Sequence, residues 1–178
     1  MKVINITGKH NIDKISEIGN DTYKAVRIHM VHLNESDLDH KLQEDMIRGL
    51  YLNVDFDEMK PNTYLKSLFK SELKNKIQGY KGQDIKKEIH NQSTIINYED
   101  VLEKLVERRL TCFYCNKQIV ILYVNVRDPS QWTLDRINND LSHTKENTCI
   151  SCLKCNLQRR LIHSDKFIFT KKLRINKI

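Results

Sequence analysis

The segment that decides the fold is framed by Cys112-Phe-Tyr-Cys115 and Cys152-Leu-Lys-Cys155, two cysteine pairs with the same spacing. Two cysteines separated by two residues let one tight turn present two thiolates to the same ion. Two such turns complete the tetrahedral shell of four sulfurs that zinc prefers. We therefore predict a structural Zn²⁺ site, closed to water, at Cys112, Cys115, Cys152 and Cys155.

The charge of the chain predicts an anionic partner. Its 178 residues carry a formal net charge of +7, and the sequence pI is about 9.1. Nucleic acid is the commonest partner of a soluble basic protein, and a charge excess that only aids solubility is the alternative. Residues 154–178 hold eight Lys or Arg residues and a single acid. The predicted phosphate contacts in this segment are Arg159, Arg160, Lys166, Lys171, Lys172 and Arg174.

The use of cysteine favours a reducing, intracellular compartment. There are five cysteines, an odd number, and no signal-peptide pattern or membrane-length apolar run accompanies them. Metal ligation is therefore preferred to disulfide bonding, and no membrane partner is expected. Cys149 is left over, either as a small buried residue or as a competitor for the metal.

A first helix is predicted shortly after residue 36. Ser36 and Asp39 have the spacing of a helix-opening capping box, in which a side-chain oxygen accepts from a free backbone amide. Apolar residues then recur at every fourth position, as one face of a helix requires. These residues are Leu38, Leu42, Met46 and Leu50.

Two further helices are predicted before the first cysteine pair. Pro61 is placed to open one of them, which we expect to end near Gly79 and to be followed by a loop over residues 80–92. Asn97 is expected to cap the other, which begins at Tyr98. The predicted helices could form a self-contained core, or a surface for self-association or for a protein partner.

The pattern changes after Cys115. Residues 119–126 are rich in β-branched and aromatic side chains, which favours a strand, and residues 132–137 are the expected returning strand. A polar loop over 138–147 and a helix from about 152 to 160 should follow. A cysteine turn, a hairpin and a helix that carries the second cysteine pair make a treble-clef arrangement.

The predicted fold class is α+β with two parts. Residues 1–107 form a mainly helical region, and residues 108–178 form a small ββα domain held together by zinc. The metal would replace much of the hydrophobic core that a segment of this size can barely build alone.

Polar residues beside the zinc ligands indicate a second cation. Asp135 lies late on the returning strand, and Asn156 directly follows Cys155. A strand packed across a helix would bring this carboxylate and this amide oxygen together. Hard oxygen ligands suit Mg²⁺ or Mn²⁺, which can stabilise charge on a scissile phosphate.

The segment from Leu110 to Leu161 resembles the zinc-containing HNH, or His-Me finger, endonucleases. The residues that carry the resemblance are Trp132-Thr-Leu-Asp135-Arg136-Ile-Asn, His143-Thr-Lys-Glu-Asn147 and Cys152-Leu-Lys-Cys155-Asn156. The resemblance implies a metal-dependent DNA endonuclease in which Asp135 and Asn156 bind the catalytic ion. It also implies that Asn147 shapes the loop by hydrogen bonding.

One position departs from the family pattern. The family usually has a histidine general base directly after the strand aspartate, where this chain has Arg136. Arginine is a poor base near neutrality but can bind and polarise phosphate. His143 is the best substitute base, and a hydrogen-bonded loop histidine is its other interpretation. A phosphate-assisted or metal-bound hydroxide, an inactive nuclease and a non-catalytic zinc module that binds nucleic acid or an assembly are the remaining alternatives.

Overall fold

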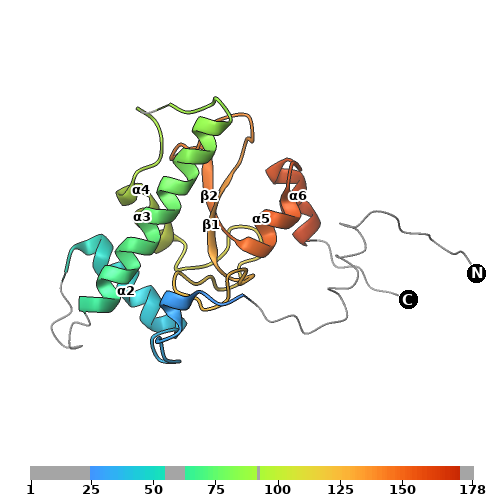
Figure 1. The fold of residues 1–178 in the computed structure, drawn as a ribbon. Coiled ribbons are helices and arrows are strands. Elements are labelled where there is room, and N and C mark those ends of the chain that lie inside the picture. The colour runs from blue at the N-terminus through green and yellow to red at the C-terminus, as the bar shows by residue number, and fades with distance from the viewer. Residues whose placement is uncertain (1–24, 55–62, 92, 173–178) are drawn as a thin grey trace, which may run out of the picture.

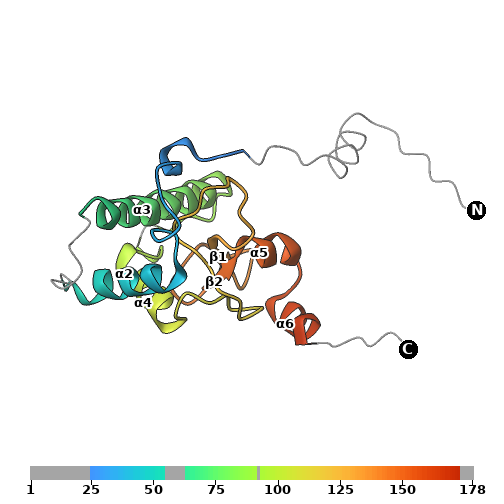
Figure 2. The same ribbon diagram turned by 90° about the horizontal axis from the view of Figure 1, so that it is seen from below.

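The computed structural model describes residues 25–54, 63–91 and 93–172. A mixed α+β fold is confirmed, with a two-stranded antiparallel sheet between two groups of helices (Figures 1 and 2). Helices α2, α3 and α4 lie on one side of the sheet, and α5 and α6 lie on the other (Figure 1). The elements are η1 (Ile28–Met30), α2 (His40–Leu52), α3 (Thr63–Lys86), α4 (Tyr98–Glu107), β1 (Trp132–Arg136), β2 (Thr148–Cys152), α5 (Leu153–Arg159) and α6 (Ser164–Lys172).

Helix α2 begins later than the capping-box pattern predicts. The side chain of Asp39 accepts from the backbone N–H of Lys41 and is the N-cap, whereas the hydroxyl of Ser36 donates to Asn34 Oδ1. The prediction of a capping box at Ser36 is therefore wrong. The predicted apolar stripe does pack against the core, and the helix ends at Asn53, whose φ of 52° is left-handed.

Helix α3 continues two turns past its predicted end. It runs through Gly79 to Lys86, so the predicted loop is wrong for residues 80–86. A glycine inside a helix costs only about 1 kcal/mol relative to alanine, which the buried side chains beyond it offset. Tyr80 and Asp84, four residues apart, both turn inward. Pro61, the predicted start of this helix, lies outside the described residues.

Helix α4 confirms its predicted cap. The side chain of Asn97 accepts from the backbone N–H of Asp100 at 2.8 Å, and the Asp100 carboxylate accepts from the backbone N–H of Asn97 at 3.3 Å. This reciprocal pair satisfies two amides that the first helical turn leaves free.

Residues 119–126 do not form the predicted strand. Within the described chain their pairing is limited to isolated bridges such as Val120 to Gln131. The backbone N–H groups of Ile121 and Leu122 instead donate to Oε1 of Gln43, at 2.7 and 2.9 Å. Strand β1 therefore pairs with β2, which places Asp135 opposite Cys149.

We expect Gln43→Leu to lower the free energy of unfolding by about 3 kcal/mol, because each buried amide left unpaired costs about 1–3 kcal/mol. Gln43 is fully buried, and its Nε2 also donates to the carbonyl of Leu38. Urea unfolding followed by circular dichroism measures the effect. Gln83→Leu on the exposed face of α3 is the control, and equal losses in the two variants would contradict this account.

Residues on both sides of the predicted boundary at 107/108 share one hydrophobic core. The hydroxyl of Tyr80 on α3 accepts from the backbone N–H of Leu134 on β1, and Lys76 Nζ donates to the carbonyl of Trp132. The core cluster runs from Met30 to Phe167. Two separable domains stay a prediction.

Helix α6 was not predicted, and it covers the first cysteine turn. Phe167 is buried, and its ring packs edge-on against Tyr114 with a centroid separation of 5.0 Å. No helix in the described ranges is both long and apolar enough to cross a membrane.

Candidate metal centre and its polar surroundings

The four predicted zinc ligands meet in space. The Sγ atoms of Cys112, Cys115, Cys152 and Cys155 all lie within 4.8 Å of one another, and all four thiols are free. Sγ of Cys115 lies 3.9 Å from Sγ of Cys152. A tetrahedral zinc site with Zn–S distances of about 2.3 Å requires sulfurs roughly 3.8 Å apart. The cluster therefore has the composition and size of a zinc site.

Local structure explains how these sulfurs converge. One pair lies in the turn between Thr111 and Gln118, and the other lies where β2 runs into α5. Cys152 is the N-cap of α5, and its sulfur accepts from the backbone N–H of Cys155 at 3.4 Å. An amide donor of this kind favours a thiolate, the form that binds metal.

The charges of the four sulfurs also favour a cation. Hydrogen bonding from Cys152 lowers the pKa of Cys112 to about 4, whereas burial raises the pKa of Cys155 to about 12. Several thiolates in this volume repel one another and are poorly solvated. A divalent ion would compensate both costs, as structural zinc sites do.

Cys149 lies outside this cluster. It is buried, and its thiol donates to the hydroxyl of Tyr114 at 3.5 Å. Burial raises its pKa to about 12, so it is a poor metal ligand in this position. Of its two interpretations, the structure favours the small buried residue.

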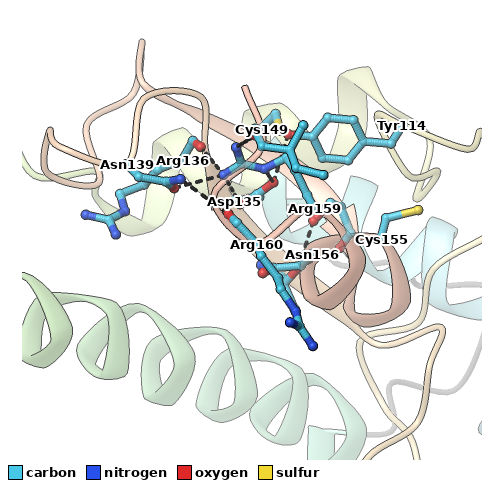
Figure 3. A network of polar contacts seen from close by, with 12 residues as sticks. Tyr114, Asp135, Arg136, Asn139, Cys149, Cys155, Asn156, Arg159 and Arg160 are labelled. Carbon is cyan, nitrogen blue, oxygen red and sulfur yellow. Dashed lines mark hydrogen bonds and ion pairs between the residues drawn. The ribbon is translucent and has the colours of Figure 1, made fainter. Parts of the chain in front are cut away.

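The carboxylate of Asp135 is held by a buried arginine (Figure 3). Arg159 donates from Nε to Oδ2 at 2.5 Å and from Nη2 to Oδ1 at 2.8 Å, and Tyr114 donates its hydroxyl to Oδ2 at 2.8 Å. Oδ1 accepts this one bond from the described residues, so one of its lone pairs remains open.

Arg159 is not the surface phosphate contact that the sequence predicted. It is 1% exposed, and its remaining donors bond to the carbonyls of Arg136 and Ile162 and to Asn139 Oδ1. The guanidinium is thus consumed by internal partners and ties α5 to the end of β1. This correction removes Arg159 from the basic surface.

Asn156 lies on the face of β1 that carries Asp135. Its Nδ2 donates to the hydroxyl of Thr133 at 3.2 Å. Thr133 and Asp135 are two residues apart on one strand, so their side chains share a face. The amide oxygen of Asn156 has no hydrogen-bond partner among the described residues and remains able to bind a cation.

Arg136 points to the opposite side of the strand. Figure 3 shows its guanidinium directed away from the Asp135 carboxylate. Its Nη1 donates to the carbonyl of Leu141 at 3.0 Å and lies 3.9 Å from Oδ1 of Asp84. This contact joins the family's divergent position to helix α3.

His143 is a buried histidine fixed by Asp84. The carboxylate of Asp84 accepts from Nδ1 of His143 and from its backbone N–H, both at 2.7 Å. The imidazole also packs on the ring of Tyr80, with centroids 4.8 Å apart. Sequence reasoning missed Asp84 because it placed the residue in a loop. The spacing of Tyr80 and Asp84 on a continued helix was the available signal.

Asn147 makes the kind of hydrogen bonds that the resemblance implies. Its Oδ1 accepts from the backbone N–H of Asn138, and its Nδ2 donates to the carbonyls of Asn138 and Ser142. These bonds close the loop between β1 and β2, and so fix the backbone around His143.

The other basic residues of the described C-terminal segment are exposed. Lys171 Nζ donates to Gln158 Oε1, which links α6 to α5. Arg174 lies outside the described residues. The exposed cations are Arg160, Lys166, Lys171 and Lys172.

Comparison with protein-family models, with curated proteins and with solved structures finds no match for this chain.

Proposed function

We propose that this protein is a metal-dependent DNA endonuclease that hydrolyses phosphodiester bonds. Structural zinc would occupy the four-cysteine cluster, and Asp135 and Asn156 would hold a separate Mg²⁺ or Mn²⁺ ion. The proposal rests on the resemblance to zinc-containing HNH endonucleases together with the order β1, β2 and α5 around the thiols.

One observation carries the proposal. The side chain of Asn156 reaches across from α5 to Thr133, on the strand face that also bears Asp135. The open lone pair of Asp135 Oδ1 and the free amide oxygen of Asn156 are hard ligands that suit Mg²⁺. A divalent ion there would neutralise charge on a phosphate, while exposed cations of α5 and α6 bind the flanking backbone.

We expect Asn156→Ala to lower the rate of plasmid cleavage in Mg²⁺ by roughly 100-fold or more, because one of two protein ligands is lost. Asn156 is preferred to Asp135 for this test, since its side chain makes one hydrogen bond in the described structure. Gln158→Ala, on the exposed part of the same helix, is the matched control. Both variants should retain one zinc per chain. Undiminished cleavage by Asn156→Ala would remove the proposed ion site.

A second candidate is a non-catalytic zinc module that binds nucleic acid. The observation that favours it is the Asp135 carboxylate itself, which already pairs with the cationic Arg159. A neighbouring guanidinium repels a divalent ion. This alternative predicts salt-dependent DNA binding, with a slope set by the number of phosphate contacts, and no cleavage with Mg²⁺, Mn²⁺ or EDTA.

A further inference from the structure

A cluster on helix α3 supplies what the Arg136 position lacks. Asp84 is 0% exposed, yet its carboxylate faces two nitrogens of His143 and the guanidinium of Arg136. The three residues come from α3, from the loop after β1 and from β1 itself. Such a buried carboxylate requires partners, and here they are a histidine and an arginine.

The geometry sets the tautomer of His143. A carboxylate accepts hydrogen bonds, so the 2.7 Å contact places the ring proton on Nδ1 and leaves the lone pair on Nε2. Nε2 has no hydrogen-bond partner among the described residues. It is also not among the unpaired side-chain atoms that protein fully shields from water. The imidazole is thus buried on one edge and open at its basic nitrogen.

The surroundings keep the ring neutral. Burial lowers the pKa of His143 from its ordinary value of 6.5, Asp84 opposes this effect, and Arg136 and Lys87 add to it. Tyr80 contributes an uncharged ring against the imidazole. A histidine with a lowered pKa is unprotonated at neutral pH and can accept a proton.

We propose that Asp84 positions His143 as the general base of this protein, and that Arg136 holds the phosphate beside it. This inference rests on the proposed nuclease function and adds a residue from outside the HNH-like segment. A water oxygen forms a bond to phosphorus as its proton passes to Nε2, and the bond from phosphorus to the leaving sugar oxygen breaks. The leaving oxygen takes a proton from solvent, and His143 returns its proton to solvent.

The first test compares cleavage by full-length variants over pH 5.5–8.5. His143→Ala should lower kcat by about 10²–10⁴-fold, the usual contribution of a general base, and added imidazole should restore part of it. Asp84→Asn should lower kcat with little change in KM. It should also move the base limb of the pH profile further toward acid, because Asp84 raises the pKa of His143. Asp140→Asn, an exposed acid in the same loop, should match the unaltered protein.

The second test does not depend on activity. Nitrogen-15 NMR of the unaltered protein should show His143 protonated at Nδ1 and unprotonated at Nε2 at pH 7. Cleavage by the unaltered protein together with full activity of His143→Ala would overturn the base assignment and leave the nuclease function standing. An absence of cleavage with every divalent ion would overturn both. Protonation at Nε2 alone would overturn the role of Asp84, whether or not Asp84→Asn folds.

Discussion

Removal of zinc should unfold the C-terminal half of this protein. Cys152→Ser should lower bound zinc from about one ion per chain to nearly none, because the residue is both a ligand and the N-cap of α5. Structural zinc contributes an apparent 10–16 kcal/mol, roughly, in small metal-dependent folds at neutral pH. Loss of near-ultraviolet circular dichroism and metal analysis after gel filtration measure the effect.

Cys149→Ala is the control for this experiment. Cys149 lies three residues before Cys152 on the same strand, is equally buried, and stands outside the sulfur cluster. It should keep its zinc and lose only about 1 kcal/mol from a small cavity. Folding of Cys152→Ser with tightly bound zinc would show that three sulfurs suffice and would contradict the four-ligand site.

Arg159→Ala should be the most destabilising single change away from the cysteines. It leaves the Asp135 carboxylate buried without its cation, which typically costs about 3–5 kcal/mol. Arg159→Lys should recover only part of this loss, because an ammonium group does not reproduce the two parallel hydrogen bonds. The midpoint of urea unfolding at constant zinc concentration is the measurement.

Arg160→Ala provides the comparison, since Arg160 is the next residue and its side chain is exposed. That variant should unfold within about 0.5 kcal/mol of the unaltered protein, as surface substitutions usually do. It should weaken DNA binding if the exposed cations contact phosphates. A stable Arg159→Ala variant with DNA binding reduced to the same degree would return Arg159 to the role that the sequence predicted.

The features that the sequence predicted well are those encoded within a few residues. The spacing within each cysteine pair predicts a metal-binding turn, and Asn97 with Asp100 predicts a helix start. The predicted helix from residue 152 or 153 likewise agrees with α5 within about one residue, because its start carries the second cysteine pair. These signals do not depend on distant parts of the chain.

The errors share a different cause, which is pairing between residues far apart in sequence. The β-branched run over 119–126 was a reasonable strand, but Gln43 takes two of its amides. Arg159 lies in a basic segment that suggests solvent exposure, and Asp135 draws it into the interior. Burial and partner choice of this kind override local propensity.

The reach of α3 has a consequence for any attempt to transplant the sulfur-clasped half into another protein. Tyr80 accepts the amide of Leu134, and Asp84 accepts the amide of His143. A fragment excised at residue 108 would lose both acceptors at once. The clasp is thus no freestanding cassette, and a graft that omits the helix would need substitutes for these two oxygens.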